Sequence, residues 1–329
     1  MMGKEELITE SMMNQRIEKL FSKSKLLCFG RYVLLAPQDA KLIFGSDFPT
    51  LPNRAKDIKQ IMEARRAEIL AKDKTAKINY FGPGPASNVM WIRYYEDEFS
   101  PKYGLESFDT YYIVGPHIFV GGGATAKSQN STVESITAKT IEVAQNLRPR
   151  APDEVPTEPG LCHEFGFTRL ASDKGQVLSQ VGLYLPELPD ITFSVESNQN
   201  ASTQGSNGHS LLKQINDRRK ELGENYPKLT TLREGKRIVH GWAGEESLVR
   251  RADGTHDFEW KFIGETGNVA KPAMLDVTMY SKVKANRIGA ASAASVDDEE
   301  ALALWDKLLE GLKFRVAVPG APSDAVALP

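Results

Sequence analysis

Apolar and polar residues alternate most regularly within residues 236–281. Phe258, Trp260 and Phe262 lie two residues apart, so an extended chain places their three rings on one face. The pattern predicts three or four consecutive antiparallel strands, with the candidate strands at 236–240, 246–251, 256–263 and 273–281. The turn at 252–255 contains Asp-Gly, a strong hairpin signal because glycine readily adopts the positive φ that matches strand twist. A half-buried sheet is therefore predicted here.

The same periodicities predict the elements of the remaining chain. Further strands are expected at 26–35, 88–95, 108–114, 116–120, 177–185 and 190–196. Helices are expected at 12–21, 54–72, 131–147, 209–222 and 295–312. In the last helix Ser295 is the predicted N-cap, and Trp305 is the residue expected to anchor the helix on a sheet. Antiparallel strands with packed helices predict an α+β fold.

Length and proline placement divide the chain into two predicted domains. A chain of 329 residues exceeds one typical core, and four prolines within 148–160 exclude both a helix and a central strand. We expect a flexible lead at 1–24, an N-terminal α+β domain at 25–148, a Pro-rich linker at 149–160, a C-terminal α+β domain at 161–316 and a disordered tail at 317–329. Each domain is expected to hold a mainly antiparallel sheet with packed helices.

The two halves share a plan. Each begins near a cysteine, and the last predicted helix of each runs into a similar segment, Asn-Leu-Arg-Pro-Arg at 146–150 and Gly-Leu-Lys-Phe-Arg at 311–315. This similarity favours a divergent internal duplication, with chance as the alternative.

The charge balance narrows the classes of partner. The chain holds 41 Lys and Arg against 43 Asp and Glu, a formal net charge of −2. Nucleic acid and anionic lipid are bound by clustered basic surfaces, so neither is expected as a partner. No apolar run approaches the ~18 residues that a membrane span needs, so no stable membrane insertion is expected. The first residues, MMGKEELITESMMNQ, are polar and acidic, and no secretory signal is visible in them.

The two cysteines, Cys28 and Cys162, leave two interpretations open. They are too few for a disulfide framework, and neither belongs to a metal-binding spacing. They could be two partly buried thiols, because free cysteine is often buried. The alternative is one bridge between the domains.

A search for catalytic or cofactor chemistry finds one tempting segment, at 121–128. Its Gly-Gly-Gly-Ala-Thr-Ala-Lys-Ser is similar to a phosphate-binding loop, but Ala126 stands where that loop needs glycine. Lys127 and Ser128 also precede the predicted helix, whereas a phosphate cradle needs them on its first turn. A nucleotide-binding enzyme that uses this segment remains an alternative, and a flexible strand-to-helix turn is the favoured interpretation.

Other catalytic signatures are missing from the sequence. His163-Glu164 lacks the second histidine of a zinc motif, the five histidines are scattered, and no Gly-x-Ser-x-Gly elbow is present. Adjacent Glu245 and Glu246 would point to opposite faces of a strand and could not act on one atom. No catalytic residue, cofactor or metal is therefore expected, and a non-catalytic binding or scaffold module is a further alternative.

A polar segment at 197–208 is the best candidate for contact with a partner. It joins a predicted strand to a predicted helix, and loops longer than about 12 residues in compact domains are usually functional or disordered. Its candidate contact residues are Ser197, Asn198, Gln199, Asn200, Gln204 and Asn207. A disordered connection is the alternative.

Two groups of short motifs carry a resemblance to a known family. One is Gly-Trp-x-Gly-Glu-Glu at 241–246, followed by Phe-x-Trp at 258–260 and a Pro-led strand. The other is Cys-Phe-Gly-Arg-Tyr-Val-Leu at 28–34. Together they resemble the immunity proteins that neutralise class-four lipase effectors of the bacterial type VI secretion system. The signature residues, interpreted as structural, are Cys28, Gly30, Arg31, Tyr32, Gly241, Gly244, Glu245, Trp260 and Pro272.

The resemblance implies an inhibitor rather than an enzyme. Its partner would be a cognate lipase (phospholipase) effector, which it would bind so that lipid cannot reach the active site, protecting the producing cell and its kin. The family implies a two-armed clamp in which both domains grip the toxin. It also implies a periplasmic location, with the cytoplasm as the alternative. The sequence leaves the oligomeric state open.

Overall fold

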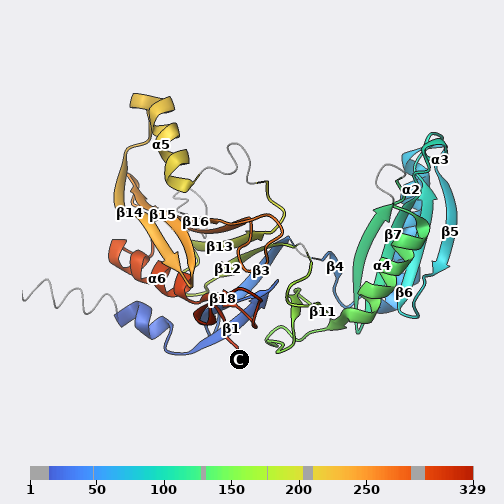
Figure 1. Ribbon diagram of the computed structural model, residues 1–329, viewed down its shortest axis with the longest axis horizontal. Coiled ribbons are helices and arrows are strands. Elements are labelled where there is room, and N and C mark those ends of the chain that lie inside the picture. The colour runs from blue at the N-terminus through green and yellow to red at the C-terminus, as the bar shows by residue number, and fades with distance from the viewer. Residues whose placement is uncertain are drawn as a thin grey trace, which may run out of the picture. The chain divides into compact units, whose positions relative to one another are not determined.

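The computed structural model describes residues 15–46, 48–126, 131–175, 177–202, 210–282 and 293–328. The chain forms two compact units (Figure 1), which are described separately. Unit 1 comprises Met1–Asp47, Val155–Gly160 and Ala171–Pro329, and unit 2 comprises Phe48–Glu154 and Leu161–Leu170. The units are interleaved along the chain, whereas the sequence analysis placed one domain after the other.

Unit 1 is built on a seven-stranded antiparallel sheet with the order β14-β15-β16-β17-β13-β12-β3. The strands are β14 (Leu229–Val239), β15 (Trp242–Arg251), β16 (His256–Ile263), β17 (Met274–Ser281), β13 (Ile191–Asn198), β12 (Leu178–Tyr184) and β3 (Lys41–Ser46). Four of them, β14 to β17, are the consecutive strands that alternation predicted. The predicted α+β class is confirmed.

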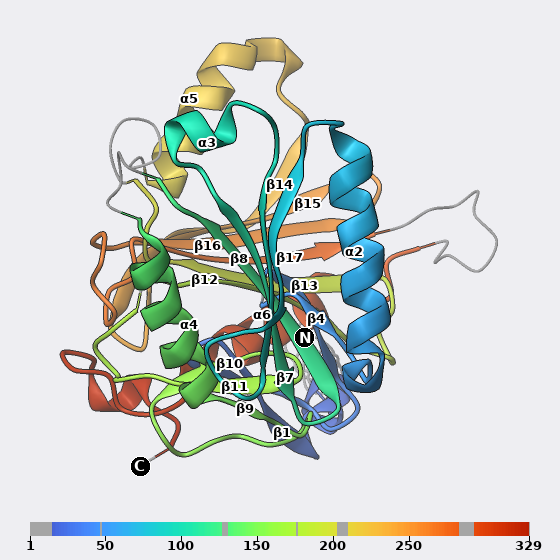
Figure 2. The same cartoon turned by 90° about the vertical axis from the view of Figure 1, so that its right-hand side faces the viewer.

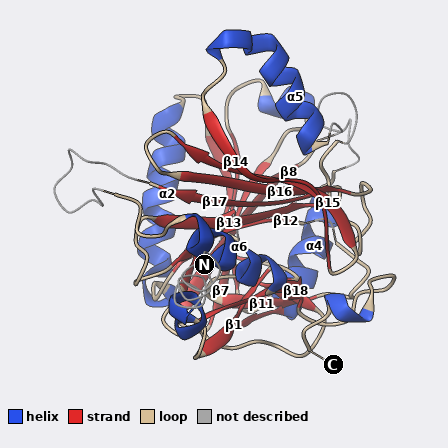
Figure 3. Ribbon diagram, turned by 90° about the vertical axis from the view of Figure 1, so that its left-hand side faces the viewer, coloured by secondary structure: helices blue, strands red, loops and turns tan. Residues whose placement is uncertain are grey.

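One face of this sheet carries the main core of unit 1. Burial alternates strictly along β16, where Phe258 and Trp260 are fully buried. Helix α6 (Asp298–Glu310) crosses this face (Figure 3). Its Trp305 is fully buried, with its ring centroid 6.2 Å from Phe193 and 5.9 Å from Phe258. The predicted anchoring role of Trp305 is confirmed.

A second, three-stranded sheet of unit 1 corrects the sequence-based interpretation of residues 26–35. Instead of one strand, the chain forms β1 (Ser24–Phe29) and β2 (Tyr32–Pro37), and β2 also pairs with β18 (Leu312–Phe314). The chain reverses at Gly30, whose φ of +47° favours glycine. Both strands are apolar, so periodicity alone did not reveal the turn.

Unit 2 has a five-stranded antiparallel sheet with a helix on each face. The strand order is β4 (Thr50–Leu51), β8 (His117–Ala124), β7 (Ser107–Val114), β6 (Val89–Tyr95) and β5 (Lys77–Pro83). Helix α2 (Ile58–Lys72) packs on a cluster containing Ile92 and Ile118, and helix α4 (Val133–Asn146) packs on a cluster containing Trp91 and Phe119. The two helices cover opposite faces of the sheet (Figure 2). A four-residue helix, α3 (Ser100–Tyr103), joins β6 to β7.

Several helices start later than the sequence predicted, by four residues in α2, where Ala55–Asp57 form a 3-10 turn, and by two or three residues in others. Helix α4 is capped by Thr132 rather than Ser131, in a reciprocal capping box with Ser135. Asp297 caps α6, accepting a hydrogen bond from Glu300 N at 2.9 Å, whereas Ser295 N donates to Asp190. Helix α5 (Leu211–Leu222) begins after Ser210 and ends at Gly223, as predicted for its stop. The short helix expected near 12–21 is described over residues 15–20.

The Pro-rich segment is ordered and does not behave as a simple linker. Short strands β9 (Leu147–Pro149), β11 (Gly166–Arg169) and β10 (Gly160–Cys162) form a three-stranded sheet at its ends. In unit 2, Arg150 donates to the carbonyl oxygens of His163 at 2.7 Å and Glu154 at 2.9 Å. In unit 1, the fully buried Arg315 donates to the carbonyl oxygens of Pro156 and Gly160. Buried guanidinium groups therefore hold the backbone that prolines keep out of regular structure.

The segment after residue 317 also differs from the expected disordered tail. Ala327 N donates to Phe314 O at 3.0 Å, and Leu328 N donates to Arg315 O at 3.0 Å. Ala325, in the short 3-10 helix η5 (Ser323–Ala325), is fully buried. This end of the chain covers the edge of β18, a role that its composition does not reveal.

Both cysteines are disulfide-bonded, which removes the interpretation as free thiols.

Candidate partner-binding surfaces

The polar segment predicted to contact a partner begins inside the sheet of unit 1. Ser197 is the next-to-last residue of β13, paired with Leu275 of β17 and Ser179 of β12. It is buried, and its Oγ shares a 2.8 Å hydrogen bond with the hydroxyl of Tyr32. Burial raises the pKa of Tyr32 to about 12, so this phenol stays protonated at neutral pH. Ser197 therefore joins β2 to the sheet and offers no surface to a partner.

Gln199 is also built into the fold, whereas Asn198 and Asn200 on either side of it reach the surface. Gln199 is buried, exchanges backbone and side-chain hydrogen bonds with Val177, and accepts one from Gly267 N at 2.9 Å. Asn198 is half-buried and Asn200 is exposed, with Asn200 N donating to Asn198 Oδ1 at 2.9 Å. The last two candidates, Gln204 and Asn207, lie outside the described residues.

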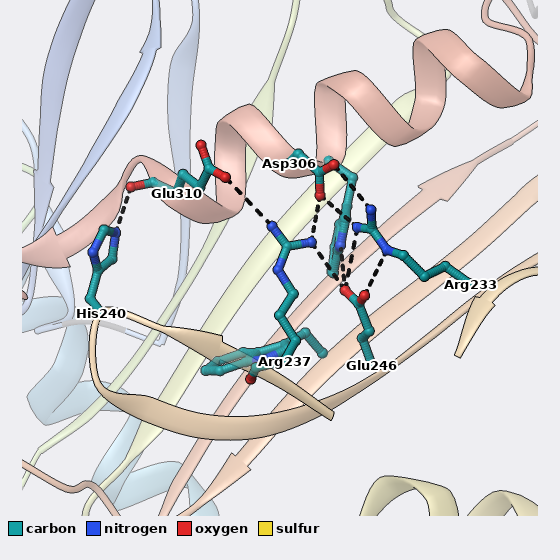
Figure 4. A network of polar contacts seen from close by, with 8 residues as sticks. Arg233, Arg237, His240, Glu246, Asp306 and Glu310 are labelled. Carbon is teal, nitrogen blue, oxygen red and sulfur yellow. Dashed lines mark hydrogen bonds and ion pairs between the residues drawn. The ribbon is translucent and has the colours of Figure 1, made fainter. Parts of the chain in front are cut away.

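An ionic network fixes helix α6 to the edge of the seven-stranded sheet (Figure 4). Arg233 on β14 pairs with Glu246 on β15 at 2.6 Å and with Asp306 on α6 at 2.5 Å. Arg237, four residues further along β14 and on the same face, contacts the same two carboxylates. The Nε1 of Trp305 donates to Glu246 Oε2 at 3.3 Å.

The two arginines of this network are matched by two carboxylates, of which Glu246 is buried and Asp306 is partly exposed. Burial opposes ionisation of Asp306, but hydrogen bonds and charge from Arg233 and Arg237 outweigh it and lower the pKa of that carboxyl. Glu246 is buried with both arginines in contact. Through the two arginines, the Glu246 carboxylate links β15 to β14 and α6.

The adjacent Glu245 and Glu246 have separate roles, as strand geometry predicted. Glu246 points toward α6, whereas Glu245 accepts a hydrogen bond from Leu212 N at 3.0 Å, in the first turn of α5. A carboxylate at a helix N-terminus satisfies an otherwise unpaired N–H group and complements the helix dipole. Glu245 therefore attaches α5 to the sheet.

The glycine-rich segment is a strand rather than the turn that the sequence favoured. Gly121, Gly122 and Gly123 belong to β8 and pair with Thr110, Asp109 and Phe108 of β7. Their backbone is extended, so successive N–H groups point to opposite edges of the strand, whereas a phosphate cradle needs them to converge on one point. Helix α4 begins only at Val133, while Lys127 and Ser128 lie outside the described residues. Nothing in the described part of this segment supports nucleotide binding.

The histidines that the structure describes lie apart in separate environments. His256 is buried against Asp298 at 2.9 Å, His240 bonds to the carbonyl oxygen of Glu310, and His163 bonds to Thr168. His117 accepts from Asn53 N. Within the described ranges no group of three or more His, Cys, Asp or Glu could hold a metal ion.

The length and polarity of the helices decide whether any of them could cross a membrane. None of the helices in the described part of the chain is long and apolar enough to cross a membrane.

A groove of about 520 Å³ opens on unit 1 between the start of β1 and the end of α6. Ser24 and Leu26 line one side, and Lys307 and Glu310 line the other. The four predicted partner residues that the structure describes, Ser197, Asn198, Gln199 and Asn200, do not line it.

Comparison with known families identifies the chain. Residues 154–317 match the family described as Tle cognate immunity protein 4 C-terminal domain. This chain carries the C-terminal domain of the Tle cognate immunity protein 4 family. No curated protein sequence matches it.

Solved immunity proteins share the fold of this chain over nearly its whole length. The apo immunity protein TplEi of the T6SS from Pseudomonas aeruginosa is 22% identical with a TM-score of 0.72, and the match covers 89% of this chain and 97% of that one. The same protein complexed with "L" peptide gives a TM-score of 0.67 at 22% identity, covering 89% and 99%. A chain of the Tle4-Tli4 complex gives 0.71 at 22% identity, covering 89% and 98%.

The N-terminal residues of the immunity-family signature are structural. A Cβ on Gly30 would lie 2.2 Å from Ser179 Oγ, so only glycine fits at this turn. Arg31 is buried and donates to the carbonyl oxygens of Ser172, Lys174 and Gly175. Burial lowers the pKa of its guanidinium, which stays charged. Tyr32 stacks on Phe29 and Phe314 at centroid distances of 5.7 and 5.2 Å.

The C-terminal signature residues shape the sheet. A Cβ on Gly244 would lie 2.6 Å from Trp260, whose ring fills that space and whose Nε1 donates to Arg237 O at 3.1 Å. Gly241 has a φ of +85° and lies against Pro322. Buried Pro272 precedes β17 and approaches Gly264 closely. These residues form and support the β14–β15 hairpin and the start of β17.

Proposed function

We propose that this protein is an immunity protein that binds and inhibits a cognate class-four lipase effector of the type VI secretion system. By occupying the effector it would keep lipid from the toxin's active site, and so protect the producing cell and its kin. The observation that carries the proposal is the fold match to a chain of the Tle4-Tli4 complex, which covers 98% of that chain. The family match over residues 154–317 supports the same conclusion.

The architecture supports inhibition by binding. The signature residues pack, cap or turn the chain, and the ionic network joins α6 to the sheet, so the polar groups that attract attention in the sequence have structural partners. An inhibitor of this kind needs a surface that fits its target and needs no reactive group. The near-neutral net charge of −2 favours recognition by shape over general electrostatic capture.

We propose further that the protein acts in the periplasm and that both units contact the effector. The family resemblance supports the location. The fold matches cover 89% of the chain, which is more than either unit alone holds, so a chain with the architecture of both units is present in the Tle4-Tli4 complex. Two linked contact areas would raise affinity through effective concentration.

Co-elution with an effector tests the proposed function. The full chain would be mixed with the purified class-four lipase effector encoded beside its gene and separated by size-exclusion chromatography. A lipase effector of another class is the matched control. We expect a stable complex with the first protein and separate peaks with the second. Separate peaks with both proteins at micromolar concentrations would reject the proposal.

A further inference from the structure

An exposed aromatic loop in unit 2 is not explained by the fold. It comprises residues 96–105, between β6 and β7, and includes α3 (Figure 2). Phe99, Tyr103 and Leu105 are 51%, 64% and 40% exposed. Among the described residues ten large apolar side chains are exposed, and these three fall within seven consecutive positions. Single exposed apolar residues are ordinary, but a group of them marks an interaction site.

The 96–105 loop is held in one conformation by its own hydrogen bonds. Asp97 Oδ1 accepts three, from Phe99 N at 2.9 Å, from Ser100 N at 2.7 Å and from Ser100 Oγ at 2.8 Å. Ser100 is buried. Leu105 N returns to Ser100 O at 2.9 Å, which closes the turn.

The far end of the loop is fastened to the sheet. Thr125, buried beside β8, donates to Gly104 O at 2.6 Å and accepts from Glu106 N at 2.7 Å. Gly104 has a φ of +65°, which ends α3 and turns the chain back toward β7. Aromatic side chains on a preformed backbone lose little conformational entropy when they bind, so this loop has the properties of an anchor in a protein interface.

The charges around the rings indicate the chemistry of the surface that they would meet. Glu96 and Glu98 are exposed, and Glu96 lies 4.0 Å from Lys72. The ammonium group of Lys102 lies 5.3 Å from the centre of the Phe99 ring. Within residues 96–105 the three carboxylates of Glu96, Asp97 and Glu98 outnumber the single ammonium group of Lys102, so the loop itself is acidic. Anionic lipid headgroups would be repelled by such a loop, whereas a protein pocket edged with Lys or Arg would be attracted.

We propose that the 96–105 loop is a principal contact of this protein with its effector, and that Phe99 and Tyr103 enter an apolar, basic-edged pocket on that protein. This inference rests on the proposed function and assigns part of the binding surface to unit 2. It differs from the polar segment at 197–208, whose first residues are built into the sheet of unit 1.

A double variant tests the loop in the full chain. The affinity for the purified class-four lipase effector encoded beside the gene would be measured for the wild type and for Phe99→Ser/Tyr103→Ser. Central aromatic contacts each contribute enough that we expect the Kd to rise by about 10- to 100-fold. Tyr184→Ser, at a tyrosine of β12 that is 41% exposed, is the matched control and should leave the Kd within about twofold. A double variant that binds as tightly as the wild type overturns the inference.

The same titration separates this inference from the proposed function. If the wild-type chain does not bind the effector, the proposed function fails and the loop's role fails with it. If the wild type binds and the double variant binds with the same Kd, the proposed function stands and only the assignment of the loop is wrong. The melting temperature of each variant should match that of the wild type because the substituted side chains are exposed.

Glu98→Lys provides a variant that leaves the aromatic residues in place. It reverses the charge at an exposed position of the loop. We expect it to lower the association rate by several-fold at low salt, with a smaller effect at high salt, because rim charges act mainly on association. An association rate that is unchanged or increased would overturn the basic-edged pocket.

Two other binding partners for the loop, a lipid surface and a second copy of this chain, are tested by parallel measurements. Sedimentation with phosphatidylglycerol vesicles that is lost in the Phe99→Ser/Tyr103→Ser variant would overturn the proposal in favour of a lipid surface. A concentration-dependent dimer in sedimentation velocity, also lost in that variant, would overturn it in favour of a second copy of this chain. We expect neither vesicle binding nor loop-dependent dimerisation.

Discussion

At the scale of single residues, two arginines show how a side chain can order a segment that prolines disrupt. Arg150 follows β9 and Arg315 follows β18, and each donates to several carbonyl oxygens of the Pro-rich segment within its own unit. The similar sequences at 146–150 and 311–315 therefore form the same local structure, a helix followed by a short strand and a buried arginine. The agreement is what an internal duplication would produce, and the duplication stays a prediction.

Replacing Arg315 tests this role. Arg315→Met keeps much of the buried side-chain volume but leaves the carbonyl oxygens of Pro156 and Gly160 without their donor. We expect the free energy of unfolding to fall by about 1–3 kcal/mol, because buried carbonyl oxygens that lose their donor stay desolvated and unpaired. Urea denaturation measures this loss, and Arg218→Met, at an exposed arginine of α5, is the control. Equal stability of both variants would contradict the role of Arg315.

The core ring of α6 allows a second test at this scale. Trp305→Ala removes a fully buried indole that contacts Phe193 and Phe258. We expect a loss of about 3–5 kcal/mol from the lost transfer energy and the cavity left behind. Ile238→Ala, at a position 72% exposed, should change stability by less than ~0.5 kcal/mol in the same assay. A small effect of Trp305→Ala would show that the indole adds little to the core.

At the scale of elements, the ionic network determines how α6 is attached and makes that attachment sensitive to pH. The pKa of Asp306 is lowered in the folded state because two arginines favour its charged form more than burial disfavours it. A lowered pKa contributes stability that is present above the ordinary aspartate value of about 3.9 and is lost as pH falls through the lower, folded value.

Comparing Asp306→Asn with the wild type over a pH series tests this coupling. We expect the variant to be less stable at neutral pH, because Arg233 and Arg237 lose a charged partner. The difference in melting temperature should start to shrink as the pH falls below about 4, where Asp306 of the unfolded chain takes up a proton. It should vanish only as the pH passes through the lower pKa of the folded protein, where the native carboxylate is protonated too. Asp257→Asn, at an exposed ion pair with Arg251, is the control for general charge effects. A difference that does not change with pH would mean that the network is not what couples Asp306 to stability.

Elements with a strong period were predictable from the sequence, and elements shaped by tertiary contacts were not. Alternation identified β14 to β17, and helical periodicity identified α2 and α6. The turn at Gly30 was missed because apolar residues continue on both sides of it, and its reason is the close approach of Ser179. One feature of the sequence could have indicated the ionic network. Arg233 and Arg237 are four residues apart, which places them on one face of a strand beside Glu246.

The candidate contact surface was less predictable than the fold. The sequence shows a polar segment at 197–208, but it could not show that Ser197 and Gln199 would be buried by partners distant in sequence. The 96–105 loop was missed because Phe99, Tyr103 and Leu105 look like ordinary core residues until the structure shows them to be exposed.

At the scale of the whole molecule, the interleaving of the units changes how a two-armed inhibitor can be tested. A cut within 148–160 would separate β1, β2 and β3 from the rest of unit 1. The seven-stranded sheet would lose an edge strand and the core would lose Tyr32 and Phe29. Separate halves would therefore fail to fold for reasons unrelated to binding, and the contribution of each unit must be measured in the intact chain.

Hydrogen exchange of the intact chain tests whether both units contact the effector. We expect slower amide exchange on effector binding at peptides of unit 2 that include residues 96–105, and also at surface peptides of unit 1. The protected core strands, such as β16, are the internal control and should exchange at the same slow rate in both states. Protection confined to one unit would contradict the two-armed mode while leaving inhibition itself intact.

Titration of lipase activity measures the central claim most directly. The purified class-four lipase effector encoded beside the gene would hydrolyse phospholipid vesicles in the presence of increasing amounts of the full chain. At an effector concentration far above the Kd, an immunity protein that acts by binding predicts a linear fall of activity that ends near one inhibitor per effector, with no effect on a lipase of another class. Full phospholipase activity in the presence of an excess of the folded chain would contradict the account.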